Sequence, residues 1–191
     1  MLRISVAAVV FLSALWPALA DGEVGKIMTP ADNLRLKNYE SVRMEALGEA
    51  KAGGDPGELA ALEQTLAKPT LPINDADLTG NWKCRTTKLG NLSPLVVYSW
   101  FKCRVTDDGS GWMLEKLSGS QRTKGRFYTD SETRLIYLGG GYVNDDPAPP
   151  YGQGPKSDEA GYAFLTGKNE WRIEFPSPYY ESKLDILELK R

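Results

Sequence analysis

Hydrophobic residues change their spacing along the chain at about residue 70. Before that point, Leu59, Leu62 and Leu66 recur at i, i+3 and i+7, the spacing of one face of a helix. After residue 78 apolar and polar residues alternate, as Trp82 and Cys84 do with the cations beside them. The pattern therefore predicts helices first and a sheet afterwards.

Two start signals place the helices. Thr29 offers a capping hydroxyl before Pro30, a residue favoured at the first helical position, and we expect a helix from about 30 to 50. Asp55 and Pro56 repeat the signal after a pair of glycines. The two helices are expected to form a helical hairpin over residues 30–67.

Eight short segments after residue 78 have the alternation expected of strands. They lie near residues 82–87, 95–105, 112–117, 125–129, 134–138, 162–165, 171–175 and 183–189. No helical pattern separates them, which favours an antiparallel barrel or sandwich. We therefore expect an α+β fold in which the hairpin packs on a mostly antiparallel β-barrel of about eight strands, over 78–191. Large residues at positions expected to face inward favour a filled barrel over a hollow one: Trp82, Phe101, Trp112, Phe164 and Trp171.

One connection is too long for a plain turn. Residues 139–161 include six glycines and four prolines, so we expect no regular element there. Loops of this length are usually functional covers or disordered segments.

The first 20 residues read as a secretory signal. Arg3 is followed by an apolar run over residues 6–15, and Ala18 and Ala20 form a small-x-small cleavage site. We expect the remainder, 21–191, to be one domain in the periplasm or outside a bacterial cell. No other stretch approaches the roughly 18 apolar residues of a membrane helix, so we do not expect the chain to span a membrane.

The two cysteines are expected to form a disulfide, because export places Cys84 and Cys103 in an oxidising compartment. A redox-active pair is the alternative, but it normally has Cys-x-x-Cys spacing. A hairpin with Cys84 opposite Cys103 also sets Trp82 opposite Val105 and Thr86 opposite Phe101, which keeps one face apolar.

The other face of that hairpin would gather cations. Lys83 falls opposite Arg104 and Arg85 opposite Lys102, with Trp100 beside them. Like charges opposite one another destabilise a sheet, so one interpretation is a binding surface for an anionic envelope component or an acidic protein. The other interpretation is a solvated face neutralised by nearby acidic residues.

Arg122 ends a polar turn, Ser118 to Arg122, that follows a predicted strand. Backbone amides and the guanidinium would suit a carboxylate or phosphate. An ordinary hairpin turn is the alternative interpretation.

The composition excludes several kinds of catalytic and metal site. The sequence has no histidine, which removes Ser-His-Asp and Cys-His catalysis and imidazole-ligated metals. Two cysteines are too few for a four-thiolate site, and no EF-hand calcium loop is present. We expect no metal, no cofactor and no nucleic-acid partner, and we assign no catalytic residue. A hydrolase would have to use carboxylates, of which Glu115 and Glu181 lie outside turns.

Several motifs resemble those of a family of exported bacterial proteins known only as a domain of unknown function. They are the Thr-Pro-Ala-Asp helix start and the segments Trp82 to Gly90, Trp100 to Arg104, Leu117 to Arg122 and Glu181 to Asp185. The resemblance implies one domain in a Gram-negative envelope and no known activity. The Gly-Asn-Trp start of the first strand resembles that of lipocalin-like barrels, and the cysteine segments resemble those of periplasmic lysozyme-inhibitor barrels.

Three functions stay open from the sequence. The first is a non-catalytic binding module in the envelope that uses the cations and Trp100. The second is a carrier of a small apolar ligand beneath the 139–161 loop. The third is a carboxylate-dependent hydrolase.

Overall fold

Helices precede strands along the chain in the computed structural model, which describes residues 21–191. The predicted secretory signal, 1–20, lies outside the described residues. The helices are α1 (Asp21–Ile27), α2 (Pro30–Lys37), α3 (Tyr39–Gly53) and α4 (Pro56–Leu66). The strands are β1 (Gly80–Leu89), β2 (Leu95–Val97), β3 (Phe101–Asp107), β4 (Trp112–Lys116), β5 (Gln121–Ser131), β6 (Arg134–Val143), β7 (Asp158–Gly167), β8 (Glu170–Pro176) and β9 (Leu184–Lys190).

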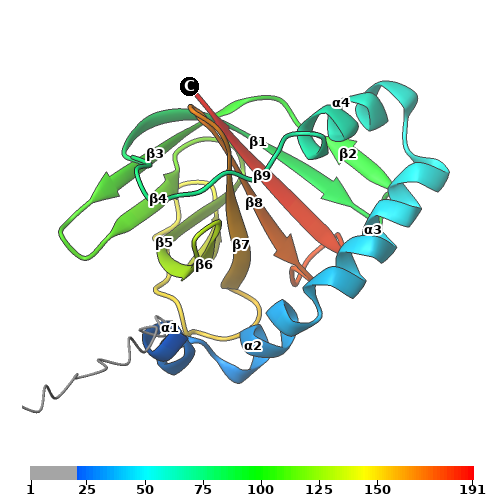
Figure 1. Cartoon of the computed structure of the whole chain (residues 1–191). Coiled ribbons are helices and arrows are strands. Elements are labelled where there is room, and N and C mark those ends of the chain that lie inside the picture. Colours follow the sequence, from blue (N-terminus) through cyan, green and yellow to red (C-terminus); the bar gives the residue numbers. More distant parts are fainter. Residues whose placement is uncertain (1–20) are drawn as a thin grey trace, which may run out of the picture.

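The strands close into an antiparallel barrel (Figure 1). β1 pairs with β3, each later strand pairs with the next, and β9 returns to pair with β1. β2 is an additional short strand beside the end of β1. The predicted α+β class is therefore confirmed, as N-terminal helices followed by a closed eight-stranded barrel with one extra strand.

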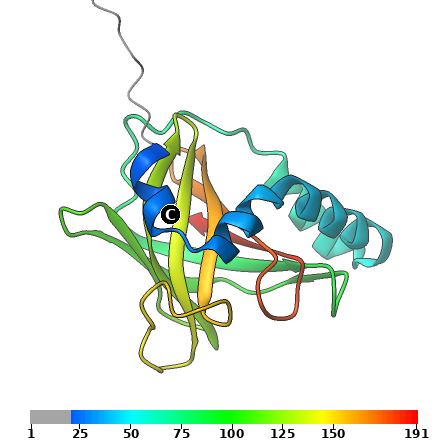
Figure 2. The same cartoon turned by 90° about the horizontal axis from the view of Figure 1, so that it is seen from below.

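The helices lie along the outside of the barrel (Figures 1 and 2). The expected single helix over 30–50 was wrong, because α2 ends at Lys37 and α3 starts at Tyr39. This break lets Leu36 pack over β6 and β7, while the Tyr39 hydroxyl donates to Glu174 of β8 at 2.9 Å. Both predicted caps are present, since the Thr29 and Asp55 side chains accept from backbone amides of α2 and α4. The short helix α1 was not predicted from the sequence.

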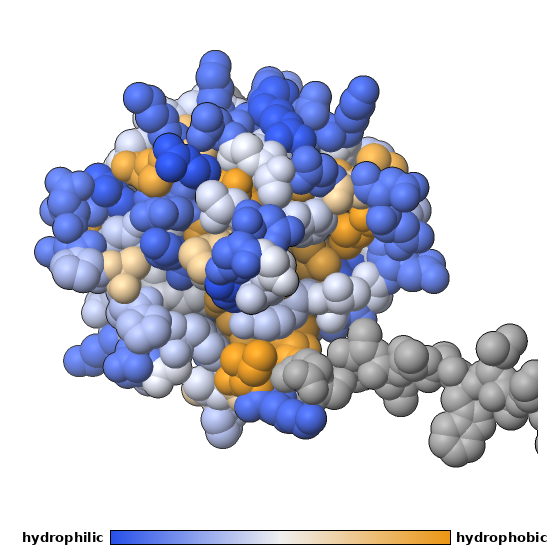
Figure 3. All heavy atoms as spheres, turned by 90° about the vertical axis from the view of Figure 1, so that its left-hand side faces the viewer, coloured by the Kyte–Doolittle hydropathy of each residue, from blue (hydrophilic) through white to orange (hydrophobic). Residues whose placement is uncertain are grey.

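Apolar contacts attach the helices to the wall. Ala46, Ala50 and Leu62 form a buried cluster with Leu89 and Ile186 of the barrel. The side of the molecule shown in Figure 3 is mostly hydrophilic, with apolar residues in separate patches. Within residues 21–191 we find no helix long and apolar enough to cross a membrane.

One half of the barrel interior is filled by side chains. Its core includes Trp82, Trp171 and Tyr137, each at most 3 % exposed. Phe164 was expected inside, but it alternates with the inward Ala163 and Leu165, and the guanidinium of Arg172 lies over its outward-facing ring. The barrel is therefore filled at one end and hollow at the other, where its wall encloses a cavity.

The disulfide is confirmed, and both sulfurs lie inside the filled half. The predicted register was wrong by two residues, since Trp82 pairs with Cys103 and Cys84 pairs with Phe101. The expected strand over 95–105 is in fact two strands, and β2 takes the pairing positions nearest the turn. A shift of two residues preserves which face each side chain occupies, so the bridge still forms, between diagonal positions.

The long connection is shorter than predicted. β6 continues to Val143 and β7 begins at Asp158, so the loop spans 144–157. The glycines of β6 serve close packing within the barrel: a Cβ on Gly125 of β5 would lie 2.4 Å from the Cα of Gly139. Glycine therefore marked a tight strand pair here and not the start of a loop.

Candidate functional site

The second half of the barrel is hollow. A cavity of about 660 Å³ opens at the end where β1, β4, β6 and β8 finish. The 144–157 loop and the 177–183 loop border it, and both lie at this end of the barrel (Figures 1 and 2). Its charged lining residues are Arg35, Lys88, Lys116, Arg122, Asp146, Lys156, Asp158, Glu159, Glu181 and Asp185.

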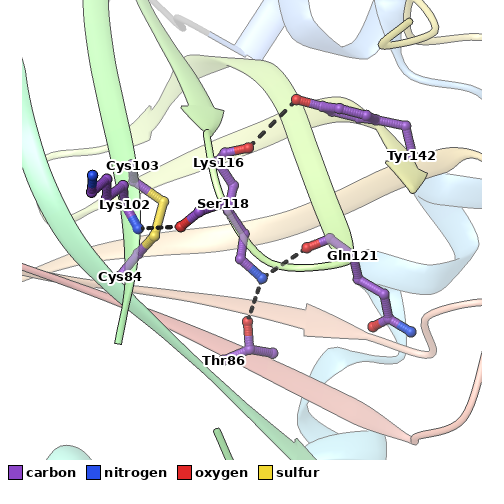
Figure 4. Close-up of a disulfide and its surroundings, with 8 residues drawn as sticks. All are labelled: Cys84, Thr86, Lys102, Cys103, Lys116, Ser118, Gln121 and Tyr142. Atoms are coloured by element: carbon purple, nitrogen blue, oxygen red, sulfur yellow. Dashed lines mark hydrogen bonds between the residues drawn. A yellow bond between two sulfur atoms is a disulfide. The ribbon is translucent and has the colours of Figure 1, made fainter. Parts of the chain in front are cut away.

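Lys116 is the last residue of β4 and continues the inward row of Trp112 and Leu114. Its ammonium donates to the Gln121 carbonyl at 2.8 Å and to Thr86 Oγ1 at 3.3 Å (Figure 4). Burial lowers the pKa of Lys116 from 10.5 to about 8, although nearby carboxylates oppose the shift. The site thus contains a buried amine that loses its proton within the range of neutral to mildly basic pH.

Glu159 lies on β7 and lines the same cavity. Burial raises its pKa from 4.5 to about 7, opposed by a hydrogen bond from Thr123 and by the charge of Lys116. Its Oε2 atom is buried and has no hydrogen-bond partner among the described residues. Gly141 makes space for this carboxyl, because an added Cβ would lie 2.7 Å from Glu159 Oε1.

Lys88, on β1, sits in a compact charge cluster that lines the same cavity. Its ammonium contacts Glu181 Oε2 at 2.8 Å and Asp185 Oδ2 at 3.6 Å. Burial works against its charge, but the two carboxylates outweigh burial and raise the pKa of Lys88. Glu181 reaches this position with a left-handed backbone, φ 69°, which a residue with a side chain rarely adopts. This cluster is therefore electrostatically complete without a ligand.

The 144–157 loop is fixed to the helices and to β7. The Tyr151 hydroxyl donates to Asp32 Oδ2 at 2.6 Å and accepts from the Thr29 amide at 3.0 Å. The Asp158 carboxylate accepts from three consecutive backbone amides of the loop, at 2.9 to 3.0 Å. These contacts hold the loop as a formed border of the cavity.

The predicted binding residues do not gather at one site: Arg122 lines the cavity, and the other five do not. Lys83 lies opposite Lys102, and not opposite Arg104, on the outer wall. Arg104 contacts Asn81 Oδ1 at 3.3 Å instead. The correction follows from the register, because β3 pairs with β1 two residues away from the expected position.

Arg85 and Trp100 form a separate pair on the outer wall. The Arg85 guanidinium lies 4.8 Å from the centre of the Trp100 ring and binds Glu188 Oε2 at 2.7 Å. Glu188 belongs to β9, which neighbours β1 only because the barrel closes. The charge of Arg85 is thus neutralised by Glu188, a partner that the sequence pattern did not predict.

Arg122, on β5, is the one predicted binding residue at the cavity. Its guanidinium donates to the Gly119 carbonyl at 3.0 Å and pairs with Asp145 Oδ1 at 3.0 Å. The predicted turn is therefore present, and the Arg122 guanidinium binds a backbone carbonyl of that same turn.

The carboxylates considered for a hydrolase do not meet. Glu115 faces outward beside Lys124, at 3.5 Å, whereas Glu181 lines the cavity. The barrel wall lies between them, so no glycosidic bond fits between these two groups. Among residues 21–191 we also find no cluster of three or more His, Cys, Asp or Glu side chains that would hold a metal ion.

Four inward charges at the hollow end were not predicted as site residues from the sequence: Lys88, Lys116, Glu159 and Asp185. For two of these residues the alternation of the strand already indicates an inward position. Lys88 continues the inward row of Trp82, Cys84 and Thr86, and Lys116 continues the row of Trp112 and Leu114. A charge at an inward strand position is a candidate site residue because its burial has to be compensated.

The model of one protein family matches residues 25–189, and that family is described as Domain of unknown function (DUF4893). No curated protein and no solved structure matches the chain significantly.

Proposed function

We propose that this chain, which belongs to the family Domain of unknown function (DUF4893), is a non-catalytic binding protein that holds a small polar ligand in its barrel. One observation carries the proposal: one end of the barrel contains a cavity of about 660 Å³ with charged side chains on its wall. Small-molecule sites usually have volumes of roughly 300 to 1,000 Å³.

The lining favours a polar ligand over the apolar one considered from the sequence. Lys88, Lys116, Glu159 and Asp185 all face this space from the strands. An apolar occupant would exclude water from these groups without replacing its hydrogen bonds, which is costly. A ligand with hydrogen-bonding groups would restore them.

Ligand-observed NMR with a library of small polar compounds tests the proposal. We expect compounds that bind the wild-type protein and lose binding in Lys116→Met, which keeps an unbranched side chain as far as Cε and removes the ammonium. Lys83→Met, on the outer wall, is the matched control and should bind them normally. Compounds that bind all three proteins equally, or a library without any binder, would contradict the proposal.

A second candidate function rests on the outer wall. Lys83 and Lys102 are exposed and lie directly opposite one another, and Arg104 is exposed nearby. Within the described residues we find no ion pair for these three cations. We propose that they contact an anionic envelope component or an acidic protein, in an interaction weakened by salt. If Lys83→Glu with Lys102→Glu leaves binding to anionic vesicles and to captured acidic proteins unchanged, the cations are only a solvated face.

We also propose that the chain is exported to the bacterial envelope and folds there as one domain over 21–191. The Cys84–Cys103 disulfide supports an oxidising compartment. Cell fractionation tests the location: recovery in the periplasm or medium, cleaved after residue 20, is expected, and recovery of the full-length chain from the cytoplasm would contradict it. Limited proteolysis that released a stable 78–191 fragment with unchanged melting would argue for two domains.

A further inference from the structure

Two largely buried charged side chains on the cavity wall, Lys116 and Glu159, are held only by hydrogen bonds to neutral groups of the described residues. Arg35 pairs with Asp32 at 3.2 Å, Lys88 with Glu181, and Arg122 with Asp145. Within residues 21–191 neither Lys116 nor Glu159 takes part in an ion pair. Because buried charges are normally paired or hydrogen-bonded, these two groups are the ones that a ligand would complete.

Lys116 has one donor to spare. An ammonium carries three N–H groups, and two of them are used by the neutral oxygens of Gln121 and Thr86 (Figure 4). The side chain is only 6 % exposed and lies over the Phe101 ring, at 4.7 Å. The remaining N–H therefore suits an anionic acceptor inside the cavity better than bulk water.

Glu159 has one acceptor to spare. Its Oε2 atom is buried without a partner in the described part of the chain, and Gly141 leaves the space in which the carboxyl stands. A buried polar atom without a hydrogen bond destabilises the folded protein, and a ligand's donor removes that penalty once the carboxyl turns Oε2 toward the cavity, to which this atom is not exposed in the structure. A cationic N–H donor would form the stronger, charge-assisted bond.

Lys116 and Glu159 line the same cavity from different strands. Lys116 stands on β4 and Glu159 on β7, with β5 and β6 between them in the wall, and within residues 21–191 the two side chains form no ion pair. A polar group placed between them would therefore meet a cation on one side and a carboxyl on the other.

We infer that the ligand of this cavity is amphoteric and presents an anionic group to Lys116 and an ammonium group to Glu159 from one end of the molecule. A free α-amino acid has this chemistry. A singly charged anion would leave Glu159 without a donor, and a singly charged cation would meet the ammonium of Lys116 uncompensated. The inference rests on the proposed function, because it concerns the ligand of the same cavity.

The mouth of the cavity fits the rest of such a molecule. Tyr98, Tyr142, Tyr179 and Tyr180 line the cavity, and Tyr179 and Tyr180 are each about half exposed. Aromatic rings at a rim offer flat apolar contacts with hydroxyls toward water. The charged end would thus lie inside, and the side chain of the ligand would lie among the tyrosines.

The test compares matched ligands on the wild-type protein, so it does not depend on any variant folding. Each amino acid is titrated beside its amine without the carboxylate and its acid without the amino group, as phenylalanine beside phenethylamine and 3-phenylpropanoate. We expect at least one amino acid to bind roughly tenfold more tightly than both of its counterparts, as two charge-assisted hydrogen bonds imply. In Glu159→Gln its advantage over the acid should shrink, and in Lys116→Met its advantage over the amine should shrink.

The outcomes separate this inference from the proposed function. If singly charged or neutral compounds bind in the cavity as tightly as the amino acids, the ligand is not amphoteric and the cavity remains a binding site. If no compound of any class binds, both proposals fail.

Discussion

Within residues 21–191, Lys116 and Glu159 line one cavity without forming an ion pair with each other. Their environments move both pKa values toward neutrality, to about 8 for the amine and about 7 for the carboxyl, chiefly through burial. A buried amine and a buried carboxyl without an ion pair destabilise the folded protein. Their presence together at the hollow end of the barrel therefore indicates a role in ligand binding.

Glu159 should make the protein less stable as pH rises from 4.5 to 7. Its folded-state pKa lies above its unfolded value, so between those values the folded state holds more of the proton and stability is lost as pH increases. The Glu159→Gln variant should lack this contribution, so the change in unfolding free energy between pH 4.5 and pH 7.5 should differ between the two proteins by about 3 kcal/mol. Urea denaturation of both proteins across this range measures it, and parallel pH profiles would contradict it.

Lys116 should titrate near pH 8, and its pKa should depend on the dryness of the cavity. Phe101 covers the ammonium at 4.7 Å, so Phe101→Ala admits water and reduces the desolvation that lowers the pKa. We expect the pKa of Lys116 to rise toward 10.5 in this variant, as measured by NMR titration of the lysine Cε resonance. An unchanged or lower pKa would show that burial is not the dominant cause.

Gly141→Ala should disturb the site more than the fold. The new Cβ would lie 2.7 Å from Glu159 Oε1, so the carboxyl has to move, and ligand binding should weaken roughly tenfold. Gly48→Ala in α3 is the matched control, since its Cβ meets no atom within 4 Å and alanine favours helix. Equal ligand affinity in the two variants would contradict the assigned role of Glu159.

Glu174 should anchor the helices to the barrel. It is fully buried and contacts Arg43 of α3 at 2.8 Å and Arg172 at 2.7 Å. Glu174→Gln leaves both guanidinium groups without their anion and should destabilise the protein by about 3 kcal/mol, measured by urea denaturation. A change below about 0.5 kcal/mol, the size typical of a surface substitution, would contradict this role.

Removing the disulfide should lower stability and spare the cavity. The Cys84→Ser, Cys103→Ser double variant removes a cross-link between positions 19 apart in the sequence and should lose about 3 kcal/mol on the chain-entropy model. Ligand affinity measured well below the melting temperature should be unchanged, because neither cysteine lines the cavity, although Cys103 pairs with Lys116 in the sheet. A large loss of affinity in a folded variant would indicate that the bridge shapes the cavity.

The sequence predicted the architecture because alternation and capping are local properties. Thr29 and Asp55 begin helices for reasons contained in a few neighbouring residues, and the strand segments follow from a period of two. The register of β1 with β3 could not be predicted from the alternation alone. It depends on β2, which pairs with the end of β1 and is positioned by contacts beyond the hairpin.

The cavity could be predicted only in part. Lys88 and Lys116 stand at inward positions of their strands, which the alternation alone identifies. That Lys116 of β4 and Glu159 of β7 line one cavity depends on barrel closure and on where side-chain filling stops, and both are global properties.

Backbone amide NMR of the wild-type protein, titrated with a mixture of free amino acids, tests the central claim most directly. The account predicts shifts that saturate and concentrate on the hollow end, at Thr86, Lys116, Thr123 and Gly141, while Lys83 and Lys102 on the outer wall stay unchanged. Shifts confined to the outer wall, or none at saturating concentrations of amino acids and of their singly charged counterparts, would contradict it.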